Sequence, residues 1–182
     1  MVHVDSGDAC KSCASRLYSY DQDMTAPTTP YSSYLGDKDP LDSIKNNIEQ
    51  IQTLTSDWPA NRFERSYAPG KWTARQVLTH LAQTELMLGN RARMAVITPQ
   101  YVAQNFDPDA WIALDAGLPG RAASDAFVAI ARMNLAFFEG LSPAARETGL
   151  THPEYGTLTV DWILHQLAGH QIHHIGQLQR VA

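Results

Sequence analysis

At residues 157–180 the chain reads TLTVDWILHQLAGHQIHHIGQLQR, and its apolar positions recur at the spacing of one helix face. The stripe advances by three or four residues at each step, which is the period of an amphipathic helix. It consists of Ile163, Leu167, His170, His174, Leu178 and Val181. We therefore predict a helix from Thr157 to about Arg180 that turns His170 and His174 toward the core.

Three further stretches have the same period. Asp39-Pro40 offers an N-cap followed by a first-turn proline, and Thr73 with Gln76 has the spacing of a capping box. The connections, 99–120 and 143–156, are rich in proline and glycine, so we expect one short helical turn at 109–114 and no strand. Four helices predict an all-α fold, a four-helix bundle. The first three run from Asp39 to Leu54, from Thr73 to about Ile97 and from Ser124 to near Gly140.

Residues 1–38 differ from the rest of the chain. They mix Ser, Thr, Asp, Tyr and Pro without a sustained period, so we expect an irregular or disordered extension before a bundle domain at 39–182. Met24 is typical of a natural protein start, which gives the hypothesis that residues 1–23 are not native. Cys10 and Cys13 form a lone C-x-x-C. Without a βαβ pattern or a second ligand pair, it predicts neither a redox nor a zinc function.

Composition and charge restrict the functional class. The 182 residues are 44% hydrophobic and 18% charged, which is typical of one globular domain. Fourteen Lys and Arg against nineteen Asp and Glu give a net charge of -5, which argues against a nucleic-acid partner. No stretch approaches the ~18 consecutive apolar residues of a membrane helix, and the N-terminus lacks a secretory pattern. We expect a cytoplasmic protein with no membrane partner.

The paired histidines of the last helix require an explanation. His170 and His174 lie one turn apart on one face, as in helical H-x-x-x-H metal sites. A buried polar group without a hydrogen-bond partner costs ~1–3 kcal/mol, and shared coordination of one ion removes that cost. His80, on an inward stripe of the second long helix, is the candidate third ligand. Three histidines leave at least one coordination position open, as in catalytic zinc sites.

Each histidine also has a simpler structural interpretation. An inward histidine is more often a core residue bonded to a carbonyl group. His173 lies on the flank of the helix and is the weaker ligand choice, although an i,i+3 pairing with His170 stays open. We interpret His165 as a residue of the pocket rim or a support for a ligand. His152, in a loop, and His3, in the extension, are expected to be solvated.

Residues outside the histidine set are candidates for supporting roles. Glu85 and Asp161 lie one turn from two of the histidines, where a carboxylate could orient an imidazole or act as a base. Exposed helical carboxylates are more often solvated. Arg91 and Arg93 could reach an anionic substrate, but their simpler interpretation is as charges on a helix surface. We interpret Trp72 as a structural plug where its helix begins.

Two motifs resemble signatures of the DinB-like family. GKWTARQVLTHL, at residues 70–81, is similar to the second-helix signature, in which a tryptophan precedes a histidine by eight residues. HQLAGHQIHHIGQL, at 165–178, is similar to the closing H-x-x-H-H-x-G-Q-L pattern. The resemblance covers about residues 40–182. An arginine often follows the second histidine of the closing pair in this family, and Ile175 takes its place here.

The resemblance implies a four-helix bundle, often dimeric, that holds a divalent metal, commonly zinc or nickel, through His80, His170 and His174. Some members are S-transferases or isomerases that use a low-molecular-weight thiol such as bacillithiol or mycothiol, and others are regarded as metal-dependent hydrolases. We expect a thiol-dependent, S-transferase-type enzyme that acts on a small molecule. Hydrolysis of a small amide or ester is one alternative, and a non-catalytic metal- or ligand-binding bundle is another.

Overall fold

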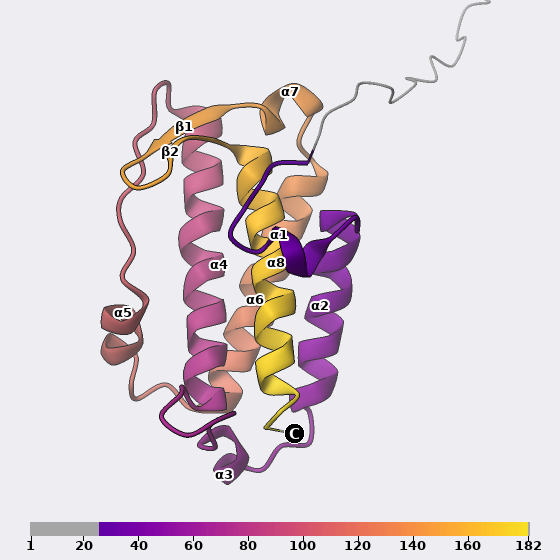
Figure 1. The fold of residues 1–182 in the computed structure, drawn as a ribbon, viewed down its shortest axis with the longest axis vertical. Coiled ribbons are helices and arrows are strands. Elements are labelled where there is room, and N and C mark those ends of the chain that lie inside the picture. Colours follow the sequence, from indigo (N-terminus) through magenta and orange to yellow (C-terminus); the bar gives the residue numbers. More distant parts are fainter. Residues whose placement is uncertain (1–25, 182) are drawn as a thin grey trace, which may run out of the picture.

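Four long helices form the body of the protein in a computed structural model that describes residues 26–181. They are α2 (Pro40–Thr55), α4 (Ala74–Ile97), α6 (Gly120–Glu139) and α8 (Val160–Leu178). They run side by side along the long axis of the molecule (Figure 1). α4 packs against α6 and α8, and α2 packs against the same two helices. The predicted four-helix bundle is confirmed.

The apolar stripes of these helices face inward and form one core. The stripe predicted for α8 is buried over its whole length, including both histidines. Because burial of apolar surface contributes about 25 cal/mol per Å² to folding, this core is the main stabilising feature of the bundle. Its fully buried side chains include Ile44, Ile51, Leu78, Leu81, Phe127, Phe138, Ile163, Leu164, Leu167 and Leu178.

The first two long helices begin at the predicted capping residues. The Asp39 carboxylate accepts a hydrogen bond from the backbone N–H of Asp42, and Pro40 occupies the first turn of α2. Thr73 and Gln76 form both bonds of the capping box at the start of α4. Both caps satisfy backbone N–H groups that have no partner inside the helix.

The other two long helices begin elsewhere than predicted. α6 begins at Gly120, and the Ser124 hydroxyl lies 2.9 Å from the Thr55 hydroxyl, so it links α6 to α2 rather than capping a helix. α8 begins at Val160 because residues 156–159 form a strand. The hydroxyl of Thr159 caps α8 by accepting a hydrogen bond from the following turn.

A small antiparallel sheet corrects the prediction that the chain has no strand. β1 (Gly149–His152) and β2 (Gly156–Thr159) form a hairpin beside the start of α8. Backbone hydrogen bonds join Thr151 to Tyr101 and Ala103, so the segment that follows α4 lies against the hairpin. Burial does alternate along β1, but the prolines and glycines around these four-residue strands favoured a loop, so no strand was predicted.

Three short helices lie in the connections. α5 (Pro108–Leu114) confirms the helical turn predicted at 109–114. α3 (Ala60–Phe63) and α7 (Pro143–Arg146) were not predicted. Each has only four residues, so neither has a period that sequence analysis could detect.

The residues just before α2 belong to the bundle. Residues 28–35, here called the N-terminal strap, contain α1 (Ser32–Leu35) and pack on α8. Leu35 is 3% exposed and joins the core, and the indole N–H of Trp162 donates to the Thr28 carbonyl at 2.9 Å. The domain boundary at residue 39 stays a prediction, and the strap before it contacts the bundle. The sequence of the strap has no amphipathic period, so periodicity could not predict these contacts.

The remaining predictions concern residues near the N-terminus and membrane-spanning helices. The predictions for His3, Cys10, Cys13 and Met24 concern residues outside the described part of the chain. Between residues 26 and 181, no helix is both long and apolar enough to cross a membrane.

Gly169 allows the strap to lie close to α8. A Cβ atom at this position would lie 2.5 Å from the carbonyl oxygen of Tyr31. We expect Gly169→Ala to displace the strap and to lower the free energy of unfolding by ~1–3 kcal/mol, which thermal unfolding measures. Gly176→Ala, in the same helix but with open space around its Cβ, should instead stabilise by ~0.5–1 kcal/mol. Equal melting temperatures for the two variants would contradict this account.

Candidate metal centre

Three histidines meet between α4 and α8. The Nε2 atom of His170 lies 2.9 Å from Nε2 of His80 and 3.0 Å from Nε2 of His174. One nitrogen from each ring lies within 4.8 Å of the other two, which is close enough for one ion to bind all three. The side chains are 7%, 3% and 4% exposed for His80, His170 and His174. The structure therefore brings together the three histidines that the sequence selected.

The contacts among these rings fit a metal site better than a hydrogen-bonded cluster. An imidazole nitrogen carries either one proton or one lone pair. Nε2 of His170 therefore cannot donate to one neighbour and accept from the other, although both lie within hydrogen-bond distance. Three lone pairs directed at one cation avoid this conflict. A set of three imidazoles also suits zinc and nickel.

Burial keeps the three rings neutral. Burial lowers the pKa of His80 to about 4, although the charge of Asp109 acts in the opposite direction. It lowers the pKa of His174 to about 3, and the positive charge that His80 would carry acts in the same direction. Burial and the neighbouring rings hold the pKa of His170 well below its usual value. At neutral pH the lone pairs are therefore available to a metal.

These low pKa values predict a weak pH dependence of metal binding. Protons compete with a metal only near and below the pKa of each ligand. We expect the affinity for zinc to change less than ~3-fold between pH 7.5 and 5.5, as measured by competition with a chelator of known pH dependence. Histidines with the usual pKa of about 6.5 would instead lose affinity steeply over this range. A loss of ~10-fold or more per pH unit would show that the ligands are ordinary solvated histidines.

Gln177 orients His174 and was not identified from the sequence. Its side-chain oxygen lies 2.7 Å from Nδ1 of His174, and its side-chain nitrogen lies 3.0 Å from Nε2 of His173. Because the amide oxygen only accepts, Nδ1 of His174 carries the proton and Nε2 keeps its lone pair for the site. Gln177 lies in the closing motif, three residues after His174, and that spacing was the available signal.

His173 supports the cluster from outside it. Its ring bonds Gln177 and packs against Tyr34 at a centroid distance of 4.8 Å. Its exclusion from the predicted ligand set agrees with this position. Tyr31 of the strap packs edge-on against His170, with ring centroids 5.0 Å apart, so the strap covers one side of the site.

Glu85, Asp161 and His165, the three residues predicted to support the site, form no hydrogen bond with the three clustered histidines among the described residues. Glu85 is buried, but its carboxylate accepts hydrogen bonds from Asn134 and Gln171 rather than from a histidine. Asp161 pairs with His165 at 3.2 Å. Burial lowers the pKa of His165, but hydrogen bonds to Asp161 outweigh it and raise the pKa overall. This pair stabilises the first turns of α8.

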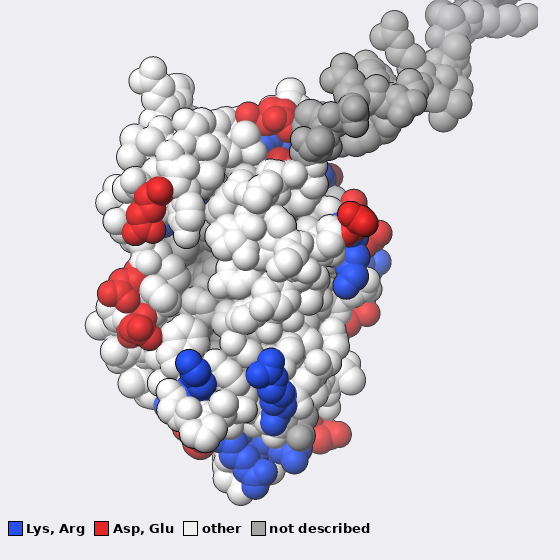
Figure 2. Space-filling view, viewed as in Figure 1, with Lys and Arg blue, Asp and Glu red and all other residues white. Residues whose placement is uncertain are grey.

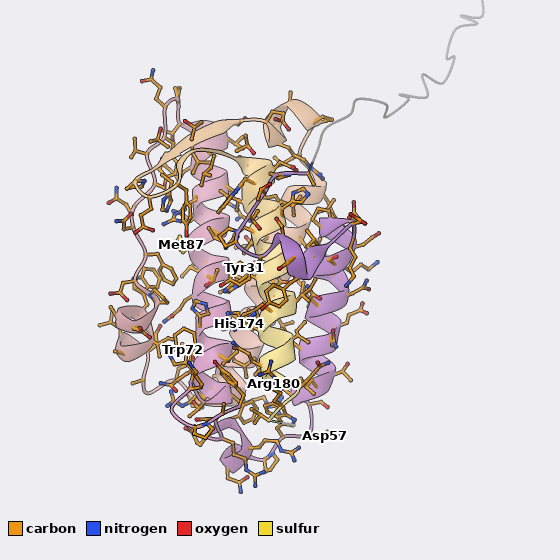
Figure 3. All side chains as sticks on the ribbon, in the orientation of Figure 1. Tyr31, Asp57, Trp72, Met87, His174 and Arg180 are labelled. Carbon is orange, nitrogen blue, oxygen red and sulfur yellow. The ribbon has the colours of Figure 1, made fainter. Side chains whose placement is uncertain are left out.

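A cavity of about 260 Å³ adjoins the cluster, and His80 and His170 are among its lining residues. Its walls are largely apolar or aromatic, with a few polar groups, which is typical of a small-molecule site. In Figure 3, Tyr31, Met87 and Trp72 lie around His174 in the region between α4 and α8. The Trp72 ring lies 4.9 Å from that of His80, which agrees with its interpretation as a plug.

Three residues interpreted as solvated or surface groups are placed otherwise. Arg91 is buried and lines the cavity. Arg93 donates to the Gly89 carbonyl and lies over the Phe137 ring, so it is a structural residue. His152 is buried in the hairpin, where its ring bonds the backbone N–H of the second residue after it. The burial of Arg91 and His152 depends on the segment after α4 and on the hairpin, which the sequence did not predict, whereas the partners of Arg93 lie in α4 and α6.

Residues 44–178 match the sequence model of the DinB superfamily. The chain belongs to the DinB superfamily. The match spans all four long helices and contains the three histidines of the cluster. The match does not include the N-terminal strap, although Tyr31 of the strap packs against His170 in this DinB chain.

Two similar proteins come from Oceanobacillus iheyensis. "Putative metal-dependent hydrolase OB0782" is 28% identical over 138 residues, which cover 73% of this DinB chain and 80% of the relative. "Putative metal-dependent hydrolase OB0413" is 22% identical over 147 residues, which cover 76% and 85%. Both names describe metal-dependent enzymes.

Two solved structures share the fold. YfiT from Bacillus subtilis is described as a probable metal-dependent hydrolase with an unusual four-helix bundle topology. It matches with a TM-score of 0.72 and 16% identity over 89% of this chain and 91% of YfiT. A mycothiol-dependent maleylpyruvate isomerase matches with a TM-score of 0.65 and 16% identity over 82% of this chain and 61% of the isomerase. Both similarities support the DinB bundle architecture.

Proposed function

We propose that this protein is a divalent-metal-dependent enzyme that uses a low-molecular-weight thiol in S-transferase- or isomerase-type chemistry on a small molecule. His80, His170 and His174 would hold the ion, for which zinc and nickel are the best candidates. When bound, the ion supplies Lewis acidity, which lowers the pKa of a thiol or water that it coordinates. The convergence of three neutral imidazoles beside a small cavity is the observation that carries the proposal.

The surroundings of the cluster favour thiol chemistry over hydrolysis. A general base for hydrolysis must lie within hydrogen-bond reach of the attacking water. Among the described residues that line the cavity, Glu154 is the single carboxylate, and it is exposed on the hairpin loop. Glu85, the buried carboxylate of α4, is already bound by two amides. A thiol would require no such base, because a metal held by the three histidines would stabilise it as the thiolate.

Each chain element contributes a distinct function to the proposed site. Gln177 holds the ring of His174 in one tautomer, and the strap limits the access of water through Tyr31.

The fold similarity to a mycothiol-dependent isomerase supports the use of a thiol. The names of the two Oceanobacillus relatives and of YfiT support hydrolysis of a small amide or ester as a second candidate function. We also infer a homodimer from the family resemblance, and a cytoplasmic location from the ordinary globular composition.

The proposal is tested with zinc-loaded and nickel-loaded protein. Thiols of several classes are offered together with chlorodinitrobenzene as the electrophile, and nitrophenyl esters and anilides are offered without a thiol. Metal-dependent loss of thiol that is absent in His174→Ala supports the proposal. Ester or amide cleavage without a thiol would replace it by the hydrolase, and inactivity in both assays with metal bound would replace it by a non-catalytic bundle.

A further inference from the structure

Arg91 lies at the opposite end of the cavity from the histidines. The cavity-lining residues His80, Thr84, Met87 and Arg91 of α4 follow one another at spacings of four, three and four and so share one face of the helix, with Leu88 beside Met87. At a rise of 1.5 Å per residue, the eleven residues from His80 to Arg91 separate their Cα atoms by ~16 Å. The cavity is therefore elongated along α4, with His80 and His170 near one end and the guanidinium of Arg91, together with His152, near the other.

Arg91 is a buried cation with unused hydrogen-bond donors. Its side chain is 7% exposed, and its guanidinium donates to the Gln104 carbonyl. A guanidinium has five N–H groups, so most of them have no protein acceptor among residues 26–181. No carboxylate in that range lies within 4.0 Å of it. No Arg91 nitrogen is among the fully enclosed unpaired atoms of the described residues, so its unused N–H groups stay accessible from the cavity, where an anion can bind them.

Arg91 is also the single cation among the lining residues. On the face shown in Figure 2, the exposed Lys and Arg side chains gather mainly at the end of the bundle away from the hairpin. Arg91 is therefore the cation that an anion inside the cavity meets. The charge acts in a site of low dielectric constant, where it is stronger than at the surface.

Two more polar groups lie along the cavity between its ends. The Thr84 hydroxyl and the side-chain oxygen of Gln166 are buried and have no hydrogen-bond partner among the described residues. Apolar and aromatic side chains, among them Met87, Phe106 and Trp162, form most of the remaining wall. This arrangement suits a chain molecule with an apolar body and one hydrogen-bonding group near its middle.

We propose that Arg91 binds the carboxylate of an elongated small molecule whose other end reaches the three histidines. The substrate class is an anionic thiol, or an anionic electrophile, with a hydroxyl or amide group between its ends. The chemistry at the histidine end rests on the proposed function, whereas the binding of a carboxylate by Arg91 does not require it. Arg91 is thus a specificity-determining residue.

Glu154 competes with such a ligand. It is the carboxylate nearest to the anion site among the lining residues, and its charge stabilises the protonated form of Arg91. It is exposed and forms no ion pair within 4.0 Å, so a ligand can approach the guanidinium without breaking a salt bridge. Removal of this carboxylate should strengthen the binding of an anion.

The test compares four probes of equal chain length by calorimetry on the zinc-loaded protein: mercaptooctanoic acid, mercaptooctanol, octanoic acid and octanol. We expect each acid to bind at least ~10-fold more tightly than its matched alcohol, because a hydrogen bond to a charged group contributes ~1.5–3 kcal/mol. Mercaptopropionic acid is too short to span the cavity and should show no preference over its alcohol. Equal binding of acids and alcohols at the longer length would overturn the proposal.

Variants separate Arg91 from the metal chemistry. The acid preference is the ratio of the affinity for an acid to that for its matched alcohol. It should fall toward one in Arg91→Met and persist in part in Arg91→Lys. It should rise in Glu154→Gln and stay unchanged in Arg132→Met, a surface control on α6. An unchanged preference in Arg91→Met would overturn the proposal. If that variant does not fold, an unchanged preference in Glu154→Gln and in Arg91→Lys overturns it. The acids could bind more tightly than the alcohols while the thiols bind no more tightly than the matched compounds without a thiol. This result would support the role of Arg91 and would refute only the proposed function.

Discussion

Replacement of His174 by alanine is expected to lower the affinity for zinc or nickel by at least ~100-fold. His174 offers its Nε2 lone pair 3.0 Å from Nε2 of His170, and Gln177 fixes its tautomer. Loss of a hydrogen-bond partner of a metal ligand already costs ~10–100-fold, and loss of the ligand itself must cost more. Competition titration against a chelator, with elemental analysis of the purified protein, measures the effect.

Two companion variants define the cause of that loss. Gln177→Ala should weaken metal binding by ~10–100-fold, because His174 loses the group that orients it. His173→Ala should have a smaller effect than either, because its ring bonds Gln177 and packs against the His174 ring at a centroid distance of 4.9 Å but contributes no nitrogen to the cluster. Far-UV circular dichroism should stay unchanged in all three, since alanine is a strong helix former. Unaltered metal content in His174→Ala would remove this residue from the site.

The sequence predicted the histidine site because the period of one helix determines which side chains meet. His170 and His174 occupy apolar positions of the α8 stripe, so packing of that stripe alone turned them inward. His80 followed from the same reasoning on α4. In each case the helical period of the apolar residues, together with the predicted bundle, was sufficient to predict that the side chain faces the core.

Residues whose position depends on other segments could not be predicted in this way. α4 is buried on several sides, so Glu85 and Arg91 lie in the interior although charged helix residues usually face solvent. Arg91 and His152 are covered by the hairpin and by the segment after α4. Tyr31 reaches His170 because Gly169 has no side chain to block the strap. Such contacts are made by short elements whose sequences show no helical or strand period, so periodicity could not predict them.

Glu85→Ala is expected to lower the free energy of unfolding by ~3 kcal/mol or more. The Glu85 carboxylate accepts hydrogen bonds from Gln171 at 2.6 Å and from Asn134 at 2.8 Å, and Asn47 donates to Gln171, so this network joins all four long helices. Alanine leaves two buried amide N–H groups without an acceptor, at ~1–3 kcal/mol each, together with a cavity. Denaturant unfolding measures the change. Glu49→Ala, which removes an exposed carboxylate of α2, should stay within ~0.5 kcal/mol of the parent protein.

The pH dependence of stability distinguishes a buried carboxylate from a merely well-packed side chain. Burial raises the pKa of Glu85 from 4.5 to about 6, against the two hydrogen bonds from Asn134 and Gln171. The folded state therefore binds a proton more readily than the unfolded state, and this group stabilises the fold as the pH falls through 6 toward 4.5. Glu85→Gln cannot titrate, so subtracting its stability from that of the parent removes the contribution of the histidines. We expect this difference to shift by about 1 kcal/mol in favour of the parent between pH 7 and pH 5. A difference that is constant over this range would mean that Glu85 has an ordinary pKa and that burial does not govern its ionisation.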